Sequence, residues 1–440
     1  MALEKARGRR IEKGELAVVV GAGRSGLAAV ELLSRKGARV RLLDRNPRVL
    51  TPAQRSAMEK KGVELLFGEH KAAHFTDAAF VIPSPGMPVA ELSRYLGDAA
   101  AAPRHDGPEI LAEMELAWRF LAEEPVLAVT GTSGKTTTAS LAASMLQAQG
   151  YAVFLGGNIG TPLSEYVLME SRADVVVVEI SSFQLQACST FCPRVGILLN
   201  LAPNHLDYHR DMREYTEAKF RLFRCQSEGD LAVLGAGLKS IASSFNLRAR
   251  TVWIDDAVER FPKSRLLGVH NRFNVEAAWQ ACRFFGVSEE NAARAVARFK
   301  PLPHRLEAVL ERDGVLYVND SKCTTVSALE AALSAFDRPV RLLCGGRFKG
   351  GDLASLTALL REKVAEVALF GASRETFEQA WQGVVPMHWH AGLAEAVDAL
   401  AAGARAGDVV LLSPATASYD LYESYKARGD DFKRIVRALQ

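Results

Sequence analysis

The sequence is poor in several features that define whole classes of protein. Its 440 residues include six cysteines and no CxxC pair, so neither a disulfide framework nor a zinc ribbon is expected. No apolar run reaches the roughly 18 residues that a membrane-spanning helix requires. Lys and Arg number 54 against 51 Asp and Glu, and this near balance predicts neither nucleic acid nor a membrane surface as a partner.

The sequence also lacks the signals of an exported protein. Its start, MALEKARGRRIEKGELAVVV, is too charged for a signal peptide, so we expect a cytoplasmic protein. The composition is otherwise that of an ordinary globular protein, with 48% hydrophobic and 24% charged residues. The cysteines, which are spaced too irregularly for pairing and are expected as reduced thiols, are Cys188, Cys192, Cys225, Cys282, Cys323 and Cys344.

Apolar strands alternate with helical segments along the chain, which predicts α/β domains with mostly parallel sheets. Strands at 15–20 and 39–44 flank a helix, and PRHDGP at 103–108 indicates a boundary, after which a helix is expected over 109–122. Further strands are predicted at 63–67, 77–82, 126–130, 174–180 and 195–200, and in VLYVND, PVRLLC, EVALFG and DVVLLS. We predict three domains, with boundaries at 1–106, 107–301 and 302–440.

A glycine turn follows the first strand. Gly21, Gly23 and Gly26 form a GxGxxG string, and Asp44 ends the next strand, where a ribose-binding acid is expected. The turn lets a helix N-terminus approach a phosphate, which any diphosphate would satisfy. A nicotinamide cofactor, another nucleotide and a purely structural turn therefore remain alternatives. The short domain favours a nucleotide other than NAD, because a full dinucleotide fold needs two βαβαβ halves.

A second glycine loop follows the strand VLAVT. The string GTSGKTT at 131–137 departs from the general phosphate-loop pattern, whose first glycine would fall at Val129. Lys135 is placed to reach the terminal phosphates of a nucleoside triphosphate, and Thr136 to hold Mg²⁺. The valine-rich strand 174–180 carries Glu179 at its end, and a carboxylate there favours a magnesium ligand over a solvent-facing acid.

Other polar residues leave more alternatives open. His205 and His209 have the i, i+4 spacing of zinc ligands, but no third ligand is evident, so one histidine near a divalent ion or two solvated loop histidines remain possible. Lys219 lies in a predicted amphipathic helix, where a single lysine is usually solvated. Polar loops at 318–325, 345–352 and 413–420 follow strands, at the edge of parallel sheets where ligands bind.

Taken together, these strings resemble the Mur ligases. The strings are TGTSGKTT, GGNIG, EISSFQL, NHLDYH, GVHNRFN, LPHR, NDSKCT and SPATASYD, which occur in this order and span nearly the whole chain. SSFQL and NDSKCT most resemble the branch of the family that adds D-glutamate. The resemblance implies an N-terminal Rossmann-like UDP-binding domain, a central P-loop ATPase-like domain and a C-terminal Rossmann-like domain.

The resemblance also implies the activity and the residues that carry it. The activity is ATP-dependent ligation of D-glutamate to UDP-N-acetylmuramoyl-L-alanine through an acyl phosphate, with two Mg²⁺ ions. Nothing in the sequence demands more than a monomer. The implied ATP-binding residues are Gly131, Thr132, Ser133, Gly134, Lys135, Thr136, Thr137, Asn271, His304, Arg305 and Asp320. The implied UDP-substrate residues are Gly23, Arg24, Ser25, Asp44, Arg45, Ser84, Gly86, Asn158 and Ser181. The implied D-glutamate residues are Lys322, Thr324, Lys349, Ser418 and Tyr425. The implied metal and catalytic residues are Lys135, Thr136, Glu179, His205 and Lys219.

One further match and two departures qualify the resemblance. Lys219 matches a lysine that is carbamylated in the family. Asn204 replaces an acid that often precedes the metal histidine, and GRFKGG around Lys349 replaces a GDGK-like string, which bears on cation tuning and glutamate recognition. A sibling ligase for another amino acid, a folylpolyglutamate-type ligase and, from another class, an NAD-dependent oxidoreductase are the alternatives.

Overall fold

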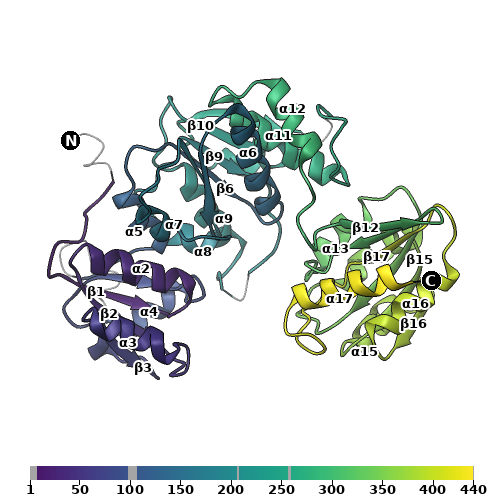
Figure 1. Cartoon of the computed structure of the whole chain (residues 1–440), viewed down its shortest axis with the longest axis horizontal. Helices are drawn as coiled ribbons and strands as arrows, with labels where there is room; N and C mark the ends of the chain where they lie inside the picture. The colour runs from purple at the N-terminus through teal and green to yellow at the C-terminus, as the bar shows by residue number, and fades with distance from the viewer. Residues whose placement is uncertain (1–6, 98–106, 206–207, 256–258, 440) are drawn as a thin grey trace. The chain divides into compact units, whose positions relative to one another are not determined.

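The computed structural model describes residues 7–97, 107–205, 208–255 and 259–439. The chain forms two compact units, one of residues 1–255 and 274–295 and the other of residues 256–273 and 296–440. Two sheets lie in the first unit and one in the second. The α/β prediction is confirmed, since helices and parallel strands alternate through both units (Figure 1).

The first sheet is parallel, and its strand order is β3-β2-β1-β4-β5. This order matches the Rossmann fold without its last strand, as the Rossmann-like prediction requires. The strands are β1 Leu16–Val20, β2 Arg39–Asp44, β3 Glu64–Phe67, β4 Ala78–Pro83 and β5 Glu109–Ile110. The helices are α2 Arg24–Arg35, α3 Pro52–Lys60, η1 Ala72–Phe75 and α4 Val89–Leu96.

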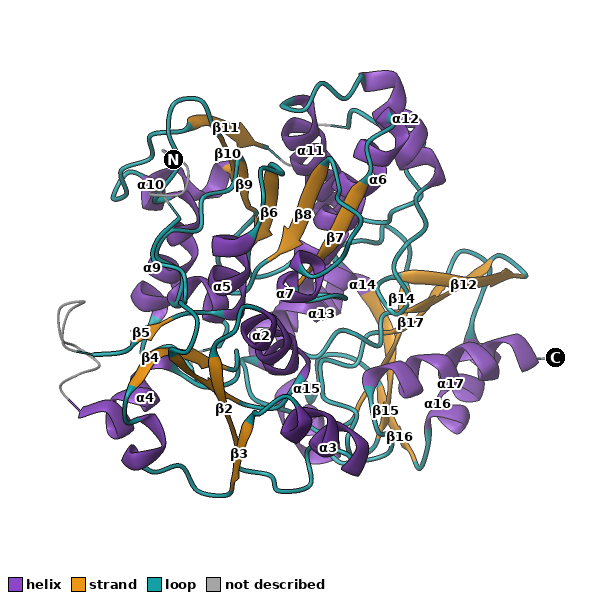
Figure 2. Ribbon diagram, turned by 60° about the vertical axis from the view of Figure 1, so that its left-hand side comes forward, coloured by secondary structure: helices purple, strands orange, loops and turns teal. Residues whose placement is uncertain are grey.

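The second sheet is also parallel, with the order β11-β10-β9-β6-β8-β7, and Figure 2 shows β6, β8 and β7 side by side. Its strands are β6 Val126–Thr130, β7 Val153–Gly157, β8 Val175–Glu179, β9 Val195–Leu198, β10 Leu231–Gly235 and β11 Arg250–Ile254. The helices from α5 onwards are α5 Glu113–Phe120, α6 Lys135–Gln149, α7 Leu163–Val167, α8 Ser182–Gln186, α9 Met212–Phe220, η3 Arg221–Phe223, η4 Ala236–Leu238, α10 Lys239–Ala242, α11 Val269–Arg283 and α12 Glu289–Arg298.

The third sheet has the order β12-β13-β17-β14-β15-β16 and is parallel except for the β12/β13 pair. Its strands are β12 Glu307–Arg312, β13 Val315–Asn319, β14 Val340–Gly345, β15 Val364–Phe370, β16 Met387–His390 and β17 Val409–Leu412. Its helices are α13 Val326–Leu333, η5 Leu353–Leu356, α14 Thr357–Lys363, α15 Arg374–Trp381, α16 Leu393–Gly403 and α17 Tyr425–Ala438.

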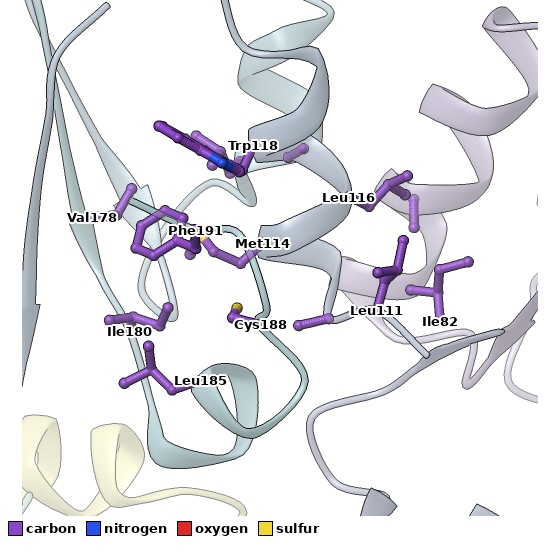
Figure 3. Packing of buried hydrophobic residues seen from close by; sticks show 14 of the residues in the cluster. Ile82, Leu111, Met114, Leu116, Trp118, Val178, Ile180, Leu185, Cys188 and Phe191 are labelled. Carbon is purple, nitrogen blue, oxygen red and sulfur yellow. The ribbon is translucent and has the colours of Figure 1, made fainter. Parts of the chain in front are cut away.

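The first two sheets share one hydrophobic core. Figure 3 shows Met114 and Leu116 of α5 in the same buried cluster as Ile82 of β4 and Val178 of β8. Burying one such side chain contributes roughly 1.5–3 kcal/mol, so α5 ties the two sheets together. The apolar residues of the two predicted domains therefore pack as one body.

The expected helix over 109–122 is wrong at its start. Glu109 and Ile110 form β5, which pairs with Phe80 and Val81 of β4, and α5 begins only at Glu113. Glu109 also accepts hydrogen bonds from the buried Arg119 guanidinium at 2.9 and 2.6 Å. Tertiary pairing at the sheet edge therefore overrides the local helical pattern. Most of PRHDGP, which suggested the boundary, lies outside the described residues, and the exact domain boundaries stay predictions.

Candidate active site

The first glycine turn is built by close backbone packing. Gly21 has φ +101°, and a Cβ at Gly26 would lie 1.9 Å from the Gly21 carbonyl oxygen, so only glycine fits at position 26. The Asp44 carboxylate accepts the Ala22 backbone N–H at 2.8 Å and the Asn46 N–H at 2.8 Å. Asp44 therefore stabilises the backbone of the turn. Its spacing in the sequence predicts a ribose ligand and does not indicate this structural role.

The other residues expected to bind the UDP substrate lie at the start of α2, on the surface and in loops of the first two sheets. Gly23 is the N-cap of α2, and Ser25 lies in its first turn. Arg24 pairs with Glu165 at 3.3 Å, and Arg45 contacts Glu91 on the protein surface at 2.5 Å. Ser84 donates its backbone N–H to the Val20 carbonyl, and Gly86 follows two residues later, with Asn158 and Ser181 in the second sheet's loops. These side chains stay a proposed substrate set.

The second glycine loop joins β6 to α6 and has the backbone of a phosphate-binding loop. Gly131 and Gly134 have φ of +149° and +83°, which side-chain-bearing residues rarely adopt. Asn200, at the end of the neighbouring strand β9, accepts the Ser133 N–H at 2.9 Å through its side chain, while its backbone carbonyl accepts the Thr132 N–H at 3.1 Å. The loop is therefore held in shape by the adjacent strand.

Lys135 opens α6 and folds back over this loop. Its ammonium donates to the carbonyl oxygens of Gly131 at 2.9 Å and Thr132 at 3.0 Å. Thr132 is fixed in turn by the buried Tyr215 hydroxyl at 2.9 Å, an interaction that sequence reasoning missed. The ammonium is thus placed at a helix N-terminus, where the helix dipole also favours phosphate groups.

A carboxylate and a hydroxyl meet beside the loop. Glu179 at the end of β8 is 2% exposed, and its two oxygens accept hydrogen bonds from the Thr136 hydroxyl at 2.7 Å and the Asn158 amide at 2.8 Å. Carboxylate and hydroxyl oxygens are the hard donors that Mg²⁺ prefers, so Thr136 and Glu179 fit this ion. Among the described residues no group of three His, Cys, Asp or Glu is placed to hold a metal ion by itself.

Lys219 is not the solvated helix lysine that its spacing predicts. It is 2% exposed, its ammonium donates to the Gly131 carbonyl oxygen at 2.9 Å, and it lies over the Tyr215 ring at 4.7 Å. Burial lowers the pKa of Lys219 well below its usual value, the charge of Lys135 lowers it further, and Glu179 opposes the shift. Since Lys135 donates to the same carbonyl oxygen, two ammonium groups meet there, and the more buried one is the one favoured to lose its proton.

The two histidines have different surroundings. His205 is exposed with φ +57°, and its ring lies 4.7 Å from that of Phe183. His209 is buried, so it is not a solvated loop histidine, and its Nε2 lies 2.9 Å from the Ser182 hydroxyl. Ser181 caps α8 through the backbone N–H of Gln184. The two histidines therefore lie in different environments, which does not support a zinc site with both as ligands.

The second unit contains the remaining predicted residues. Asp320 follows β13 and accepts hydrogen bonds from the Ser413 hydroxyl at 2.9 Å and the Leu306 N–H at 3.2 Å. Burial raises the pKa of Asp320 to about 7, although both hydrogen bonds oppose the shift. The Lys322 ammonium lies 3.9 Å from the centre of the Tyr425 ring, and that of Lys349 lies 5.9 Å from that of Tyr419. Two cations beside aromatic faces suit an anionic ligand.

The other predicted residues of this unit lie in α11 and in the loops that precede and follow the strands. Asn271 is buried and donates to the Leu267 carbonyl at 2.7 Å, and His304 has φ +64° with Nδ1 3.0 Å from the Asn319 amide. Ser418 is buried, whereas Thr324 and Arg305 are half-buried. These contacts fix the loops, while the ligands of these residues stay proposals.

Sequence reasoning missed Arg428, which lies fully buried in α17. Its guanidinium donates to Ser321, Gly345 and Thr416, one residue from each of the three strand-end loops. A signal was present in the sequence, because Arg428 lies on the apolar stripe formed with Phe432, Ile435 and Val436 at helical spacing. An arginine on such a stripe must find polar partners inside the protein.

Glu113 of α5 gives a testable pH dependence. Its carboxylate accepts the Ser164 N–H in the first turn of α7 at 2.6 Å, and burial raises its pKa from 4.5 to about 7. The folded protein therefore gains stability from protonated Glu113 that is complete below pH 4.5 and is lost as the pH rises towards 7. We expect Glu113→Gln to become more stable relative to the parent across this window, by up to ~1.4 kcal/mol per pH unit.

Urea-unfolding midpoints at several pH values across that window would measure this effect. Glu59→Gln, which changes an exposed acid on α3, is the matched control and should follow the parent at every pH. A difference between Glu113→Gln and the parent that does not vary with pH would contradict the assignment.

The two parallel sheets and the loop between β6 and α6 define a nucleotide-binding α/β protein. The chain also matches three family descriptions in order: Mur ligase MurD-like, N-terminal domain, over 15–102; Mur ligase middle domain, over 129–253; and Mur ligase, glutamate ligase domain, over 304–416. The chain belongs to the Mur ligase family.

Within this family, several relatives are similar over their whole length. The UDP-N-acetylmuramoylalanine–D-glutamate ligase of Desulfovibrio desulfuricans is 68% identical over 441 residues, with all of both chains covered. The enzyme of the same name from Nitratidesulfovibrio vulgaris is 61% identical over 439 residues, again with full coverage of both.

Among solved structures, MurF ligase from Thermotoga maritima in complex with ADP is 18% identical and has a TM-score of 0.58. The match covers 98% of this chain and 99% of that one. This likeness supports the fold. No helix within the described ranges is long and apolar enough to cross a membrane.

Proposed function

We propose that this protein is an ATP-dependent ligase that joins D-glutamate to UDP-N-acetylmuramoyl-L-alanine. The observation that carries the proposal is the identity of 68% over the full chain to a ligase of that name, together with an intact phosphate loop. A sibling ligase and a folylpolyglutamate-type ligase remain weaker alternatives, because the solved structures of folylpolyglutamate synthases are only about 15% identical. The NAD-dependent oxidoreductase has no support from these relatives.

The reaction must turn a poor electrophile into a reactive one. An oxygen of the L-alanine carboxylate attacks the γ-phosphorus of ATP, ADP leaves, and an acyl phosphate forms. The D-glutamate amine then attacks the acyl carbon, the C–O bond to phosphate breaks, and the amine loses a proton as the amide and inorganic phosphate are released. Catalysis of such transfers rests mainly on positioning and on charge stabilisation.

The residues of the first unit would serve the phosphoryl transfer. Lys135 would neutralise charge on the terminal phosphates, and the backbone N–H groups of the loop would hold the other phosphate oxygens. Thr136 and Glu179, with His205 as a further candidate, would hold Mg²⁺, which supplies charge neutralisation for the phosphates when bound. Asn158, which donates to Glu179, would keep that carboxylate oriented.

The residues of the second unit would serve D-glutamate, which carries two carboxylates and an amine. Lys322 and Lys349 supply positive charge for the carboxylates, while Ser418 and Thr324 offer hydroxyl groups. Tyr425 supports Lys322 through its ring. Asn271, His304, Arg305 and Asp320 would contact the nucleotide. We further propose that the protein works as a cytoplasmic monomer.

Release of ADP tests the substrate assignment. ADP formation is measured with ATP, Mg²⁺ and UDP-N-acetylmuramoyl-L-alanine, after adding D-glutamate, L-glutamate, L-lysine or L-alanine in turn. Only D-glutamate should give sustained release. Release with L-lysine would identify a sibling ligase, and no release with any amino acid would overturn the ligase assignment.

Carbamylation of Lys219 forms a separate proposal. A neutral amine adds to CO₂ to give a carbamate anion with loss of one proton, and the buried environment of Lys219 favours the neutral amine. The resulting anion would lie beside the phosphate loop, where it would complement the cations held there.

We expect Lys219→Ala to lose most ligase activity, because an alanine provides neither amine nor anion. Acetate or another short carboxylic acid should restore part of this activity by occupying the vacated space. The control is Lys239→Ala, an exposed lysine of α10, which should retain activity and show no response to acetate. Full activity of Lys219→Ala without acetate would remove the proposed role.

A further inference from the structure

A hollow of about 370 Å³ lies in the first unit, beside the C-terminal end of α9. Its size falls in the range of small-molecule sites, roughly 300–1,000 Å³. Residues of α9 and of the segments 221–224 and 245–248 line it, including Phe220, Arg221, Arg224, Phe245 and Arg248. None of these residues belongs to the phosphate loop or contacts it in the interactions described above, so the hollow is separate from the proposed ATP site.

One wall of the hollow is aromatic and firmly packed. The rings of Phe220 and Phe245 are stacked with centres 3.9 Å apart and an angle of 1° between their planes. Phe223 packs against Phe220 at 6.0 Å, and both belong to the hydrophobic core. Because the core holds these rings in place, the wall is preformed and does not need to be ordered by a ligand.

The hollow also carries an excess of positive charge. Two of its three arginines donate to backbone oxygens, since Arg221 donates to the Gln186 carbonyl at 2.8 Å and Arg248 to the Arg224 carbonyl at 3.2 Å. The acid that lines the hollow, Glu217, is engaged by Arg213 outside it at 2.9 Å. Three guanidinium groups therefore surround a space that holds one acid already paired.

The half-buried Arg221 is consistent with an excess of positive charge in the hollow. Burial lowers the pKa of Arg221 and the nearby Arg224 charge lowers it further, while Cys188 and Glu217 oppose the shift. A bound anion would offset both effects, because opposite charge stabilises the protonated guanidinium. Planar guanidinium groups match carboxylate and phosphate oxygens through paired hydrogen bonds.

We propose that this hollow binds a small organic anion, whose carboxylate or phosphate group meets Arg224 and Arg248 and whose apolar part lies against the Phe220–Phe245 stack. The site is distinct from those of the proposed ATP, UDP-sugar and D-glutamate substrates. Phe220 directly follows Lys219 in the chain, so a ligand against its ring would contact the helix that positions Lys219.

Titration calorimetry with phenyl phosphate tests the site, because this probe combines a phosphate with a flat apolar ring. Saturating ADP and Mg²⁺ are present throughout, so that the phosphate loop is occupied. One molecule should bind per chain, and the double variant R224S/R248S should weaken binding roughly tenfold or more through the loss of charge-assisted hydrogen bonds. Benzoate titrated in the same way shows whether the hollow prefers a carboxylate or a phosphate.

Two further variants make the outcome decisive. Arg210→Ser removes an exposed arginine whose acid partner, Glu214, does not line the hollow, and this variant should bind like the parent. Asn246→Glu places a carboxylate at the exposed rim without touching the core, and it should also weaken binding. Absence of phenyl phosphate binding to the parent, or equal binding to the parent and R224S/R248S, would overturn the proposal.

Discussion

Replacing Lys135 by alanine should reduce the rate of ADP formation by about 10³-fold, while the fold is retained. The Lys135 ammonium is the cation at the N-terminus of α6, directly above the glycine loop, where negative charge develops on the transferred phosphoryl group. Its present partners are the backbone carbonyls of Gly131 and Thr132, which water can satisfy in the variant. The loss should therefore fall on catalysis rather than on stability.

Three measurements separate these effects. ADP release is followed under saturating substrates, thermal unfolding is compared with the parent, and ATP binding is measured with a non-hydrolysable analogue. Lys36→Ala, an exposed lysine of the same unit, is the control and should change none of them. Lys135→Arg tests geometry against charge, since it keeps the cation and alters its shape. Activity of Lys135→Ala above a tenth of the parent would rule out the assignment.

Most of the fold could be predicted from the sequence, because a buried strand appears as a short run of apolar residues. Runs such as LAVVV and VVVVE are buried on both faces, as parallel strands between helix layers must be, and each predicted strand agrees with an observed one within a few residues. The strands β7, β10, β11, β12 and β16 were not predicted. The predicted helix fails at Glu109 and Ile110, because no local pattern marks the strand that these residues form. A two-residue edge strand has no periodicity to detect, and only pairing with β4 defines it.

The site was predictable where chemistry depends on neighbouring residues in the chain. Gly131, Gly134 and Lys135 form one local loop, so their spacing alone indicates phosphate binding. Lys219 shows the limit, because its ammonium reaches the Gly131 carbonyl oxygen over a separation of 88 residues, and no pattern around it reports this burial. Asp44 shows another limit, since its spacing suits a ribose ligand while its carboxylate holds the backbone of the turn.

Arg428 carries the second large prediction. Arg428→Lys should raise the KM for D-glutamate at least tenfold and lower stability by roughly 3 kcal/mol, the cost of breaking a buried charge network. The Arg428 guanidinium makes five hydrogen bonds, which join the loops that carry Lys322, Lys349 and Ser418. A lysine has one nitrogen and cannot reach three loops at once.

The charge state of Arg428 strengthens this expectation. Burial lowers its pKa to about 10, so it stays protonated at neutral pH, and within the described residues no carboxylate lies in salt-bridge contact with it. Its charge is therefore balanced by carbonyl and hydroxyl oxygens, and each oxygen left without a donor in Arg428→Lys costs about 1–3 kcal/mol. The loops would relax to recover these hydrogen bonds, which displaces the proposed glutamate ligands.

Steady-state kinetics with each substrate varied in turn separates positioning from simple destabilisation. The KM for D-glutamate should rise more than the KM for ATP, because all three loops carry proposed glutamate ligands and only the loop after β13 carries Asp320. Arg434→Lys, which alters an exposed arginine of the same helix paired with Asp431, should leave both constants unchanged. If Arg428→Lys raises both KM values equally, or neither, then Arg428 supports the fold without positioning the glutamate loops.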